Sequence, residues 1–425
     1  MKRMASNEKN VVDPVVSYHS RSPSPLGAQG NSEELKRIRF AMGLRDFSKK
    51  RGGAERYLVD LCNRMATEGF EVHVYAEHWD EEDQKICFHS VKTIPFPKSL
   101  QLLSFAIKAT KEIENGNYDI TFGVGNTLKA DVLQPHGGVH WAWFWKSLRA
   151  YENPIVWTIK FLGRILSPKQ WVSGWIEDVP YKRKKFSKII AISEMVKEDM
   201  MQWYQIPEDR IKVVYNGVDT ERFNPQNRKY RDEIRKRYGI EDEFILLFVS
   251  NNFRMKGLGY LIKALAKMKK GNYPSFKLFV LGGDHQAPYR RLAHKTGVCD
   301  KVLFIGRTDE PEKYYGASDF LVHPTFYDAC SLTVLEALAS GLPVITTHFN
   351  GASGMITQSR EGWVMSDPRD DQALVEKISF YLNHDRIEKS SIVARHLAES
   401  YSLERNWREM DGVFRKSLLG GRTSG

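Results

Sequence analysis

The sequence predicts an α/β protein with two doubly wound parallel sheets, one in each of two domains. Short apolar runs alternate with longer helical patterns, and this alternation comes in two series. A stretch rich in turn residues, at 215–226, separates the two series. The 425 residues are enough for two domains with separate hydrophobic cores.

The first series begins with a strand predicted at 38–44. A helix follows it, because apolar residues recur with a helical period at Tyr57, Leu58, Leu61 and Met65. Further β-branched and apolar runs predict strands at 71–77, 118–124 and 188–193.

The second series predicts strands at 244–250, 276–283, 301–306, 319–324 and 342–347. Its clearest helical patterns lie at 257–270 and 332–340. We therefore expect a polar tail at 1–36, domains at 37–216 and 217–400, and a C-terminal helix within 401–425. In such sheets ligands bind at the carboxyl ends of the strands.

The composition is that of a globular protein with a net charge of +11, which suggests an anionic partner. There is no apolar run of about 18 residues that could span a bilayer, and no apolar signal-peptide core. The four cysteines are scattered without metal-ligand spacing. We expect a reducing, cytoplasmic location.

Residues 139–188 are unusually basic and aromatic. They hold six of the ten tryptophans, and an excess of seven Lys and Arg over Asp and Glu. This composition is typical of a surface that lies on an anionic membrane, and Lys160 and Arg164 interrupt its longest apolar run. It is also compatible with a binding site for single-stranded nucleic acid, or with ordinary core and a solvated face at 182–185. We expect a membrane surface and no nucleic acid, because no nucleic-acid motif is present.

Five motifs follow one another along the chain: "RGGAERYLVDLCNRMATEGFEVHVYAE" (51–77), "AISEMVKEDM" (191–200), "IKVVYNGVDTERFNP" (211–225), "MKGLGYLIKAL" (255–265) and "HPTFYDACSLTVLEALASGLPVITT" (323–347). In this order they resemble the retaining, nucleotide-sugar-dependent glycosyltransferases of group 1, and among these the lipopolysaccharide core glucosyltransferases. The resemblance spans about residues 38–400. It implies the GT-B architecture, in which two Rossmann-like domains face a central cleft and the C-terminal helix returns to the first domain.

The resemblance implies transfer of a hexose, with glucose from UDP-glucose as the leading candidate, to a lipid-linked or lipopolysaccharide-core glycan, with no cofactor. With the basic segment, it implies a peripheral position on the inner face of the cytoplasmic membrane. No D-x-D motif occurs in a plausible donor loop, so we expect transfer without a metal ion. A nucleotide-sugar hydrolase or epimerase on the same fold, or a non-catalytic sugar-nucleotide-binding membrane protein, remain alternatives.

The stretch 326–345 corresponds to the E-x7-E motif of the family, with Asp328 where the first Glu is usual. The resemblance implies that Glu336 holds the ribose of the donor and that Asp328 contacts its sugar. It places the loop of Ala329, Cys330, Ser331 and Leu332 against the sugar and diphosphate. The residue pattern agrees, because Ser331 is a suitable N-cap and the free N–H groups of the following helix would face the diphosphate.

The resemblance gives Lys256 the role of neutralising the leaving diphosphate. A second cation is usual five residues earlier, where this chain has Asn251, and nearby Arg254 is a candidate substitute. In the first domain His136 matches the active-site histidine that contacts the transferred sugar, and His140 is a weaker candidate.

Glycines are the remaining candidates for donor binding. Gly52 and Gly53 match the glycine loop near the acceptor and diphosphate, while Gly282 and Gly283 would let the chain pass the nucleotide. His323 matches a motif position that we expect to be structural.

Overall fold

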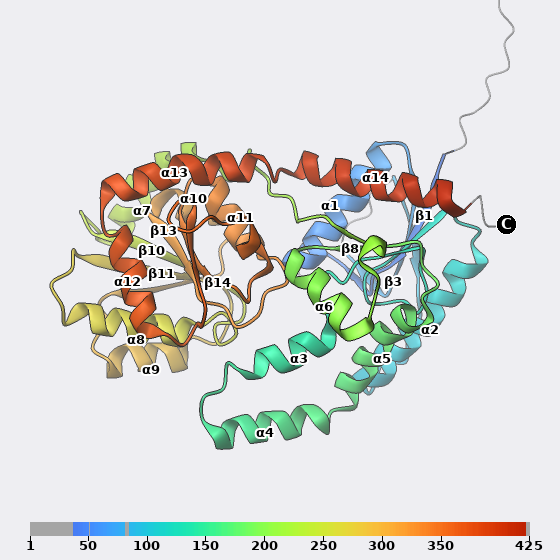
Figure 1. Ribbon diagram of the computed structural model, residues 1–425, viewed down its shortest axis with the longest axis horizontal. Helices are drawn as coiled ribbons and strands as arrows, with labels where there is room; N and C mark the ends of the chain where they lie inside the picture. The colour runs from blue at the N-terminus through green and yellow to red at the C-terminus, as the bar shows by residue number, and fades with distance from the viewer. Residues whose placement is uncertain (1–36, 51, 81–84, 422–425) are drawn as a thin grey trace, which may run out of the picture. The chain divides into compact units, whose positions relative to one another are not determined.

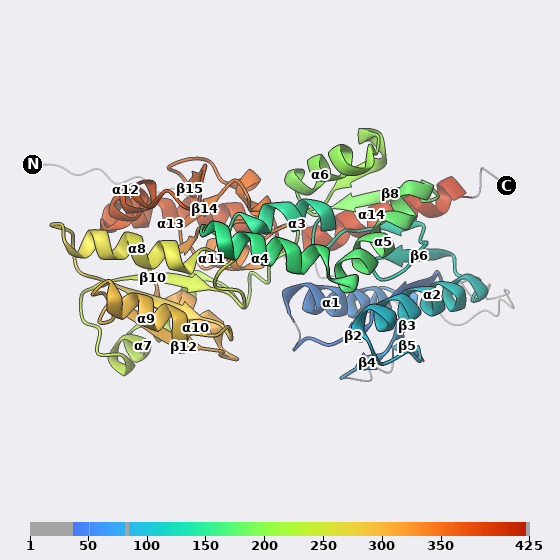
Figure 2. The same ribbon diagram turned by 90° about the horizontal axis from the view of Figure 1, so that it is seen from below.

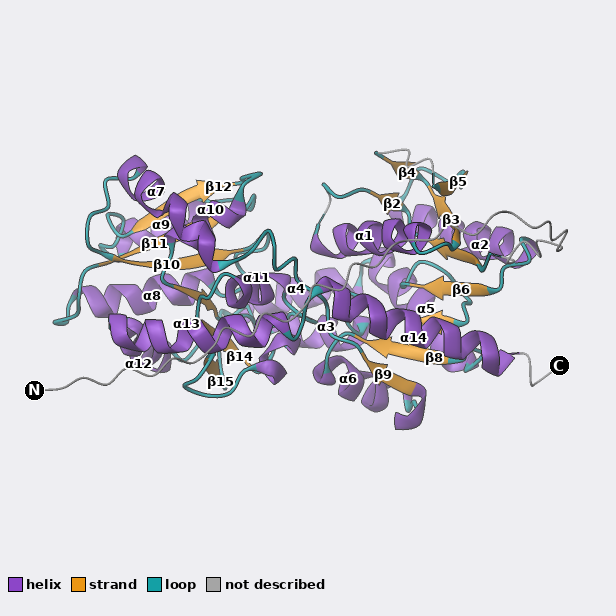
Figure 3. Ribbon diagram, turned by 90° about the horizontal axis from the view of Figure 1, so that it is seen from above, coloured by secondary structure: helices purple, strands orange, loops and turns teal. Residues whose placement is uncertain are grey.

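The computed structural model describes residues 37–50, 52–80 and 85–421, so the predicted tail at 1–36 lies outside the described residues. Two large parallel sheets, with helices packed on both of their faces, confirm the predicted α/β class (Figure 1, Figure 3). A small ladder of β2 (Asp46–Phe47) and β4 (His78–Trp79) accompanies them.

The first sheet has seven parallel strands in the order β5-β3-β1-β6-β7-β8-β9. They are β1 (Arg39–Gly43), β3 (Glu71–Ala76), β5 (Ile86–Ser90), β6 (Ile120–Gly123), β7 (Val132–Leu133), β8 (Lys188–Ala191) and β9 (Ile211–Val213). The helices of this half are α1 (Gly53–Thr67), α2 (Lys98–Asn115), α3 (His140–Leu148), α4 (Pro154–Ile165), α5 (Pro168–Arg183) and α6 (Glu194–Tyr204). The strand predictions do not include β5, β7 and β9, because β7 and β9 have three residues or fewer and β5 is a half-exposed edge strand.

The second sheet has six parallel strands in the order β12-β11-β10-β13-β14-β15. They are β10 (Phe244–Val249), β11 (Phe276–Leu281), β12 (Val302–Gly306), β13 (Phe320–His323), β14 (Val344–Thr347) and β15 (Gly362–Met365). Its helices are α7 (Arg231–Arg237), α8 (Leu258–Lys269), α9 (Ala287–Lys295), α10 (Pro311–Ala317), α11 (Leu332–Ala339), α12 (Asp371–Tyr381) and α13 (His384–Glu399), with short 3-10 turns at Pro225–Tyr230 and Gly351–Met355. A further 3-10 turn, Glu208–Arg210, precedes β9 in the first half. Its central strands are buried over nearly their whole length, as expected for a parallel sheet covered on both faces.

The last helix, α14 (Leu403–Gly421), packs on the first sheet although it follows the second in sequence (Figure 1). The Phe414 ring lies 5.5 Å from that of Phe40 and 5.4 Å from that of Phe122. Met410 is fully buried in the same core. The chain therefore crosses between the two sheets twice.

The two crossings touch each other. Val218 and Ser402 form an isolated parallel bridge, and a Cβ added to Gly217 would lie 2.7 Å from the Leu403 Cα. Close packing at this point leaves no space for a side chain at Gly217. Both connections between the sheets consequently run through one small region.

The basic, aromatic segment 139–188 forms α3, α4 and α5 (Figure 2). Trp141 and Trp143 pack against the core, whereas Trp145, Trp171 and Trp175 are about half exposed. No helix among the described residues is long and apolar enough to cross a bilayer. The segment thus contains both core and surface tryptophans.

Candidate active site

The candidate site forms where central strands of the second sheet end. The connection from β10 to α8 carries Lys256, and the connection from β13 to α11 runs from His323 through 324–331. Because β10 and β13 are neighbouring parallel strands, both connections leave the same edge of the sheet. Gly257 is required there, since its φ is +78° and a Cβ would lie 2.1 Å from the Pro324 carbonyl oxygen.

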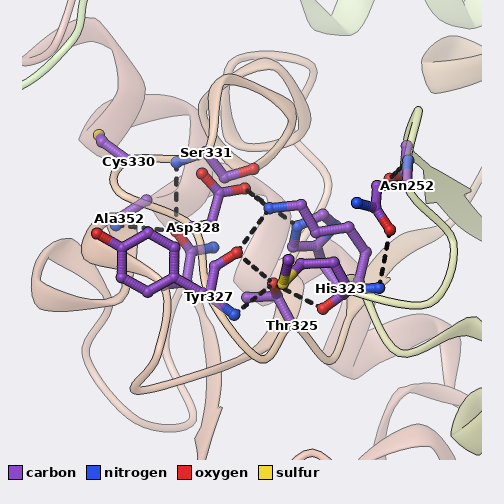
Figure 4. Close-up of polar contacts among 12 residues, drawn as sticks. Asn252, His323, Thr325, Tyr327, Asp328, Cys330, Ser331 and Ala352 are labelled. Atoms are coloured by element: carbon purple, nitrogen blue, oxygen red, sulfur yellow. Dashed lines mark hydrogen bonds and ion pairs between the residues drawn. The ribbon is translucent and has the colours of Figure 1, made fainter. Parts of the chain in front are cut away.

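Lys256 and Asp328 form an ion pair at this edge. Figure 4 shows Asp328 with its neighbours Tyr327 and His323. The Lys256 Nζ lies 2.5 Å from Asp328 Oδ2 and donates a second hydrogen bond, of 2.9 Å, to the Tyr327 carbonyl oxygen. Burial alone would raise the pKa of Asp328, but the charge of Lys256 and the proximity of His323 hold that pKa below its usual range. Asp328 is therefore ionised at neutral pH and already neutralises Lys256.

His323 lies beneath this pair, with its Nε2 3.5 Å from Asp328 Oδ2. Its side chain is 1% exposed, and burial lowers its pKa, so the imidazole is neutral at pH 7. The side chain packs on the ring of Phe248, which lies on the neighbouring strand β10 of the same sheet. His323 supports Asp328 from the core side.

Side chains of the first domain hold the loop between Asp328 and α11. The Ser193 hydroxyl donates to the Ala329 carbonyl oxygen at 2.8 Å, and the Asn216 amide donates to the Cys330 carbonyl oxygen at 3.2 Å. All four residues are buried. The loop is thus fixed by two segments that lie more than a hundred positions away in the sequence.

The first turn of α11 has no side-chain cap. Ser331 occupies the predicted N-cap position, but its hydroxyl makes no capping hydrogen bond, and its own N–H donates to Asn350 Oδ1 at 3.2 Å. A Cβ on Gly53 would lie 3.0 Å from Leu332 Cδ1, so the glycine loop of the first domain comes close to the helix start. Uncapped N–H groups at a helix start favour an anion.

Glu336, in the second turn of α11, lines a cavity of about 510 Å³. The cavity is bounded by α1, the segment 217–223, α11 and the start of α14. The Tyr315 hydroxyl donates to Glu336 Oε2 at 2.7 Å. Burial raises the pKa of Glu336, and the Tyr315 hydrogen bond and the charges of Arg56 and Arg222 oppose that rise. Asp328 does not line this cavity, so the two carboxylates of the motif have separate surroundings.

His136 is buried behind α1. Its ring stacks on Tyr57 with 4.8 Å between centroids, and its Nδ1 lies 3.3 Å from Gln134 Oε1. Burial lowers the pKa of His136 to about 4, so the ring is neutral and can act only through hydrogen bonds. The same loop approaches the second domain, because a Cβ on Gly138 would lie 1.9 Å from the Tyr327 hydroxyl.

The other donor-binding candidates that follow β10 and β11, all within the described residues, form no hydrogen bond or ion pair with the side chains of Lys256 and Asp328. The exposed Arg254 guanidinium lies 5.0 Å from the centre of the Tyr151 ring. Asn251 Oδ1 accepts a 3.1 Å hydrogen bond from the Gly283 N–H and so fixes the turn after β11. Gly282, with φ +126°, and Gly283 line a second cavity of about 660 Å³.

Sequence reasoning missed several polar residues of the site: Ser193, Asn216, Tyr315 and Asn350. Ser193 and Asn216 lie inside the motifs at 191–200 and 211–225, and their place in these motifs could have identified them as site residues. Nothing in the sequence distinguishes Tyr315 from a core tyrosine. His140 begins α3, where its N–H donates to Glu177 Oε1 at 2.8 Å. Among the described residues, no three His, Cys, Asp or Glu side chains come together to hold a metal ion.

Family models match both halves of the chain. The model described as "Glycosyl transferases group 1" matches residues 230–395, and the model described as "Glycosyltransferase Family 4" matches residues 51–222. The two matches do not overlap, and together they cover about four-fifths of the chain.

Curated relatives extend over most of the chain. The lipopolysaccharide glucosyltransferase WaaG of Escherichia coli is 26% identical over 364 residues, which cover 83% of this chain and 92% of that protein. The D-inositol 3-phosphate glycosyltransferase of Pseudarthrobacter chlorophenolicus is 24% identical, with coverage of 73% and 77%.

Solved structures share the fold. The crystal structure of WaaG aligns with a TM-score of 0.74 at 22% identity, over 88% of this chain and 99% of that one. The structure of Anabaena HepE in complex with UDP-glucose aligns with a TM-score of 0.64 at 16% identity, over 89% and 100%.

Proposed function

The chain belongs to the group 1 glycosyltransferases of GT-B architecture, and from this we propose that it moves a hexose from a nucleotide diphosphate sugar to a glycan with retention of configuration. Glucose, carried by UDP, is the leading candidate. A lipopolysaccharide glucosyltransferase aligned over 92% of its length supports glucose and a lipid-linked or lipopolysaccharide-core acceptor. The related fold that holds UDP-glucose supports the donor.

One observation carries the proposal: the Lys256 cation lies beside the loop that leads to the uncapped start of α11, and one turn further along that helix Glu336 lines a cavity. This arrangement suits a long ligand with an anionic centre. In the proposed complex the diphosphate lies between Lys256 and the α11 start, the ribose lies at Glu336, and the sugar lies toward Asp328. Gly53 permits the close approach of the first domain at the diphosphate.

In the proposed reaction the acceptor hydroxyl oxygen bonds to C1 of the sugar on the face from which the diphosphate departs. The bond between C1 and the diphosphate oxygen breaks with its electron pair, and that oxygen takes the acceptor proton. Negative charge grows on the departing phosphate, so Lys256 and the α11 start stabilise the transition state more than the ground state. Neutral His136 positions the sugar by hydrogen bonding.

The Lys256–Asp328 pair makes donor binding an exchange of partners. Lys256 must share or leave Asp328 when the diphosphate arrives, and Asp328 then becomes available to sugar hydroxyls. Asp is one methylene shorter than the Glu usual in the family. Asp328→Glu should therefore change the relative rates with different donor sugars, and an unchanged donor profile and rate would remove Asp328 from this role.

A transfer assay with a panel of nucleotide sugars tests the proposal. The protein is incubated with UDP-glucose, UDP-galactose, GDP-mannose or ADP-glucose, with and without membrane lipid or core oligosaccharide. Transfer that requires an acceptor and persists in EDTA is expected. Turnover without an acceptor would indicate a hydrolase, binding without turnover a non-catalytic protein, and loss in EDTA with recovery in magnesium would contradict metal-independent transfer.

The surface of α4 supports a peripheral position on an anionic membrane, which we propose to be the inner face of the cytoplasmic membrane. Its residues Ile155, Ile159 and Leu162 are 71%, 61% and 49% exposed, and Lys160 is exposed beside them. Apolar side chains interleaved with cations suit an interface of anionic lipid.

Vesicle flotation tests this part of the proposal. We expect binding to phosphatidylglycerol vesicles at low salt and none to phosphatidylcholine vesicles. The double substitution of Ile159 and Leu162 by Glu should abolish binding while the far-UV circular dichroism stays unchanged. Equal binding of the wild type and this variant would contradict the assignment of α4.

A further inference from the structure

Tyr315, on α10, makes a contact that the reaction scheme does not use. Tyr315 is fully buried, and its hydroxyl donates to Glu336 Oε2 at 2.7 Å. The hydroxyl also makes a longer contact, of 3.4 Å, to the Thr333 carbonyl oxygen. Its ring packs edge-on against Phe223 at 5.3 Å, and Phe223 lines the cavity of Glu336. The hydroxyl is thus held by the core and directed at a carboxylate of the site.

The two oxygens of Glu336 have different surroundings. Oε2 is taken by Tyr315, whereas Oε1 accepts no hydrogen bond from the part of the chain that the structure describes. The charged groups that face the carboxylate come from three directions: Arg56 on α1, Arg222 in the segment 217–223, and Glu312 on α10. Neither arginine makes a hydrogen bond to Glu336 in the described residues.

We infer that Tyr315 is a positioning residue for the donor, which anchors Glu336 through Oε2 so that Oε1 is presented to a ribose hydroxyl in the cavity. This inference rests on the proposed function and deepens it. A glutamate side chain has three rotatable bonds, and fixing it before the ligand arrives lowers the entropic cost of binding. The phenol also donates to the ionised carboxylate, which is the form that accepts hydrogen bonds from hydroxyl groups.

Tyr315→Phe isolates the hydroxyl, because the phenyl ring keeps its packing against Phe223. Tyr314→Phe is a matched control on the same helix: Tyr314 is also buried, but its hydroxyl lies 3.1 Å from that of Tyr238, away from Glu336. The measurement is the affinity for UDP and for 2′-deoxy-UDP by calorimetry between pH 5 and 8. GDP and ADP are measured as well, and the nucleotide that the wild-type protein binds most tightly is used to compare the variants.

For Tyr315→Phe we expect about ten-fold weaker binding of the ribonucleotide. We also expect a smaller preference over the 2′-deoxy form, and kcat should change less than KM for the sugar donor. The loss of affinity on acidification should begin at higher pH, because the hydrogen bond that lowers the pKa of Glu336 is gone. Tyr314→Phe should match the wild type in all of these.

Two failures are distinguishable. If Glu336→Ala leaves nucleotide affinity unchanged, the ribose role of Glu336 is wrong and the inference is overturned with it. If Glu336→Ala weakens binding but Tyr315→Phe behaves as Tyr314→Phe does, only the positioning role is overturned. Should Tyr315→Phe not fold, Glu336→Gln decides. If Tyr315 anchors the side chain, its hydroxyl keeps the single amide oxygen and the NH2 group, which cannot accept a hydrogen bond, faces the ribose, so a lost preference for the ribose supports the inference. A retained preference would mean that the amide oxygen is free to turn to the ribose, and it would contradict the inference.

Discussion

The helices α4 and α11 are both rich in apolar residues, but they differ in how far those residues are buried. Eight residues form α11, and five of them are buried: Val334, Leu335, Ala337, Leu338 and Ala339. Twelve residues form α4, and none of them is buried. Both helices contain a majority of apolar side chains, so hydrophobicity by itself does not separate them.

The difference lies in what each helix packs against. α11 lies between β13, β14 and α13, and the first domain holds the loop before it at Ala329 and Cys330. α4 packs mainly against α3 and α5 along one side. The apolar residues of α11 therefore stabilise the fold, whereas the exposed apolar residues of α4, Ile155, Ile159 and Leu162, remain in contact with water and are available to an external partner.

The largest effect is expected from the charge beside the start of α11. Lys256→Ala should lower kcat by about a hundred- to a thousand-fold, because it removes the cation that we propose to stabilise the departing phosphate. Lys267→Ala, on the exposed side of α8, is the matched control and should leave kcat unchanged. Steady-state rates with saturating donor measure both, and equal kcat values would place the chemistry elsewhere.

The next effect tests the burial contrast directly. Leu335→Ala in α11 should lower the free energy of unfolding by about 2–5 kcal/mol, because it opens a cavity in a closed core. Ile159→Ala in α4 should change it by less than about 0.5 kcal/mol. Urea unfolding followed by circular dichroism gives both values, and a destabilised Ile159→Ala would show that α4 has an unrecognised packing partner.

Asp328→Asn should lower the free energy of unfolding at pH 7 by about 2 kcal/mol. This is below the usual range for fully buried pairs, because the two side chains are 17% and 19% exposed. The pKa of Asp328 is held below its unfolded value of about 3.9. The stabilisation is therefore complete above that value and is lost as the pH falls through the folded pKa. Unfolding at pH 7 and pH 3 should show a difference between wild type and variant that shrinks on acidification.

The smallest effect concerns the loop that leads into α4. The Lys263 Nζ lies 3.2 Å from Glu152 Oε2, with both side chains about half exposed. Lys263→Ala should cost less than about 1 kcal/mol, because exposed ion pairs contribute little. In the same loop Ala150 is 6% exposed within the core of the second sheet, so Ala150→Asp should destabilise far more. Similar thermal midpoints for these two variants would contradict the docking of this loop.

Most of the regular structure could be predicted from local pattern. The long central strands and the helices α1, α8 and α11 follow from apolar periodicity, and Gly341, with φ +73°, ends α11 where the sequence predicts. The strands β7 and β9 could not be predicted, because two or three residues have no measurable period. In the site, the motif positions of Asp328 and Glu336 were readable, but their hydrogen-bond partners were not.

What the sequence by itself determined is the α/β class, the order in which the two series of strands and helices follow one another, and the motif positions of the candidate site. Tertiary structure alone decided that Lys256 pairs with Asp328, 72 positions away, that Tyr315 holds Glu336, and that α14 covers the first sheet. It also decided that α11 is buried and α4 is not. The reason is physical: periodicity reports which face of an element is apolar, whereas burial and ion pairing depend on which distant segment the chain topology brings against that face.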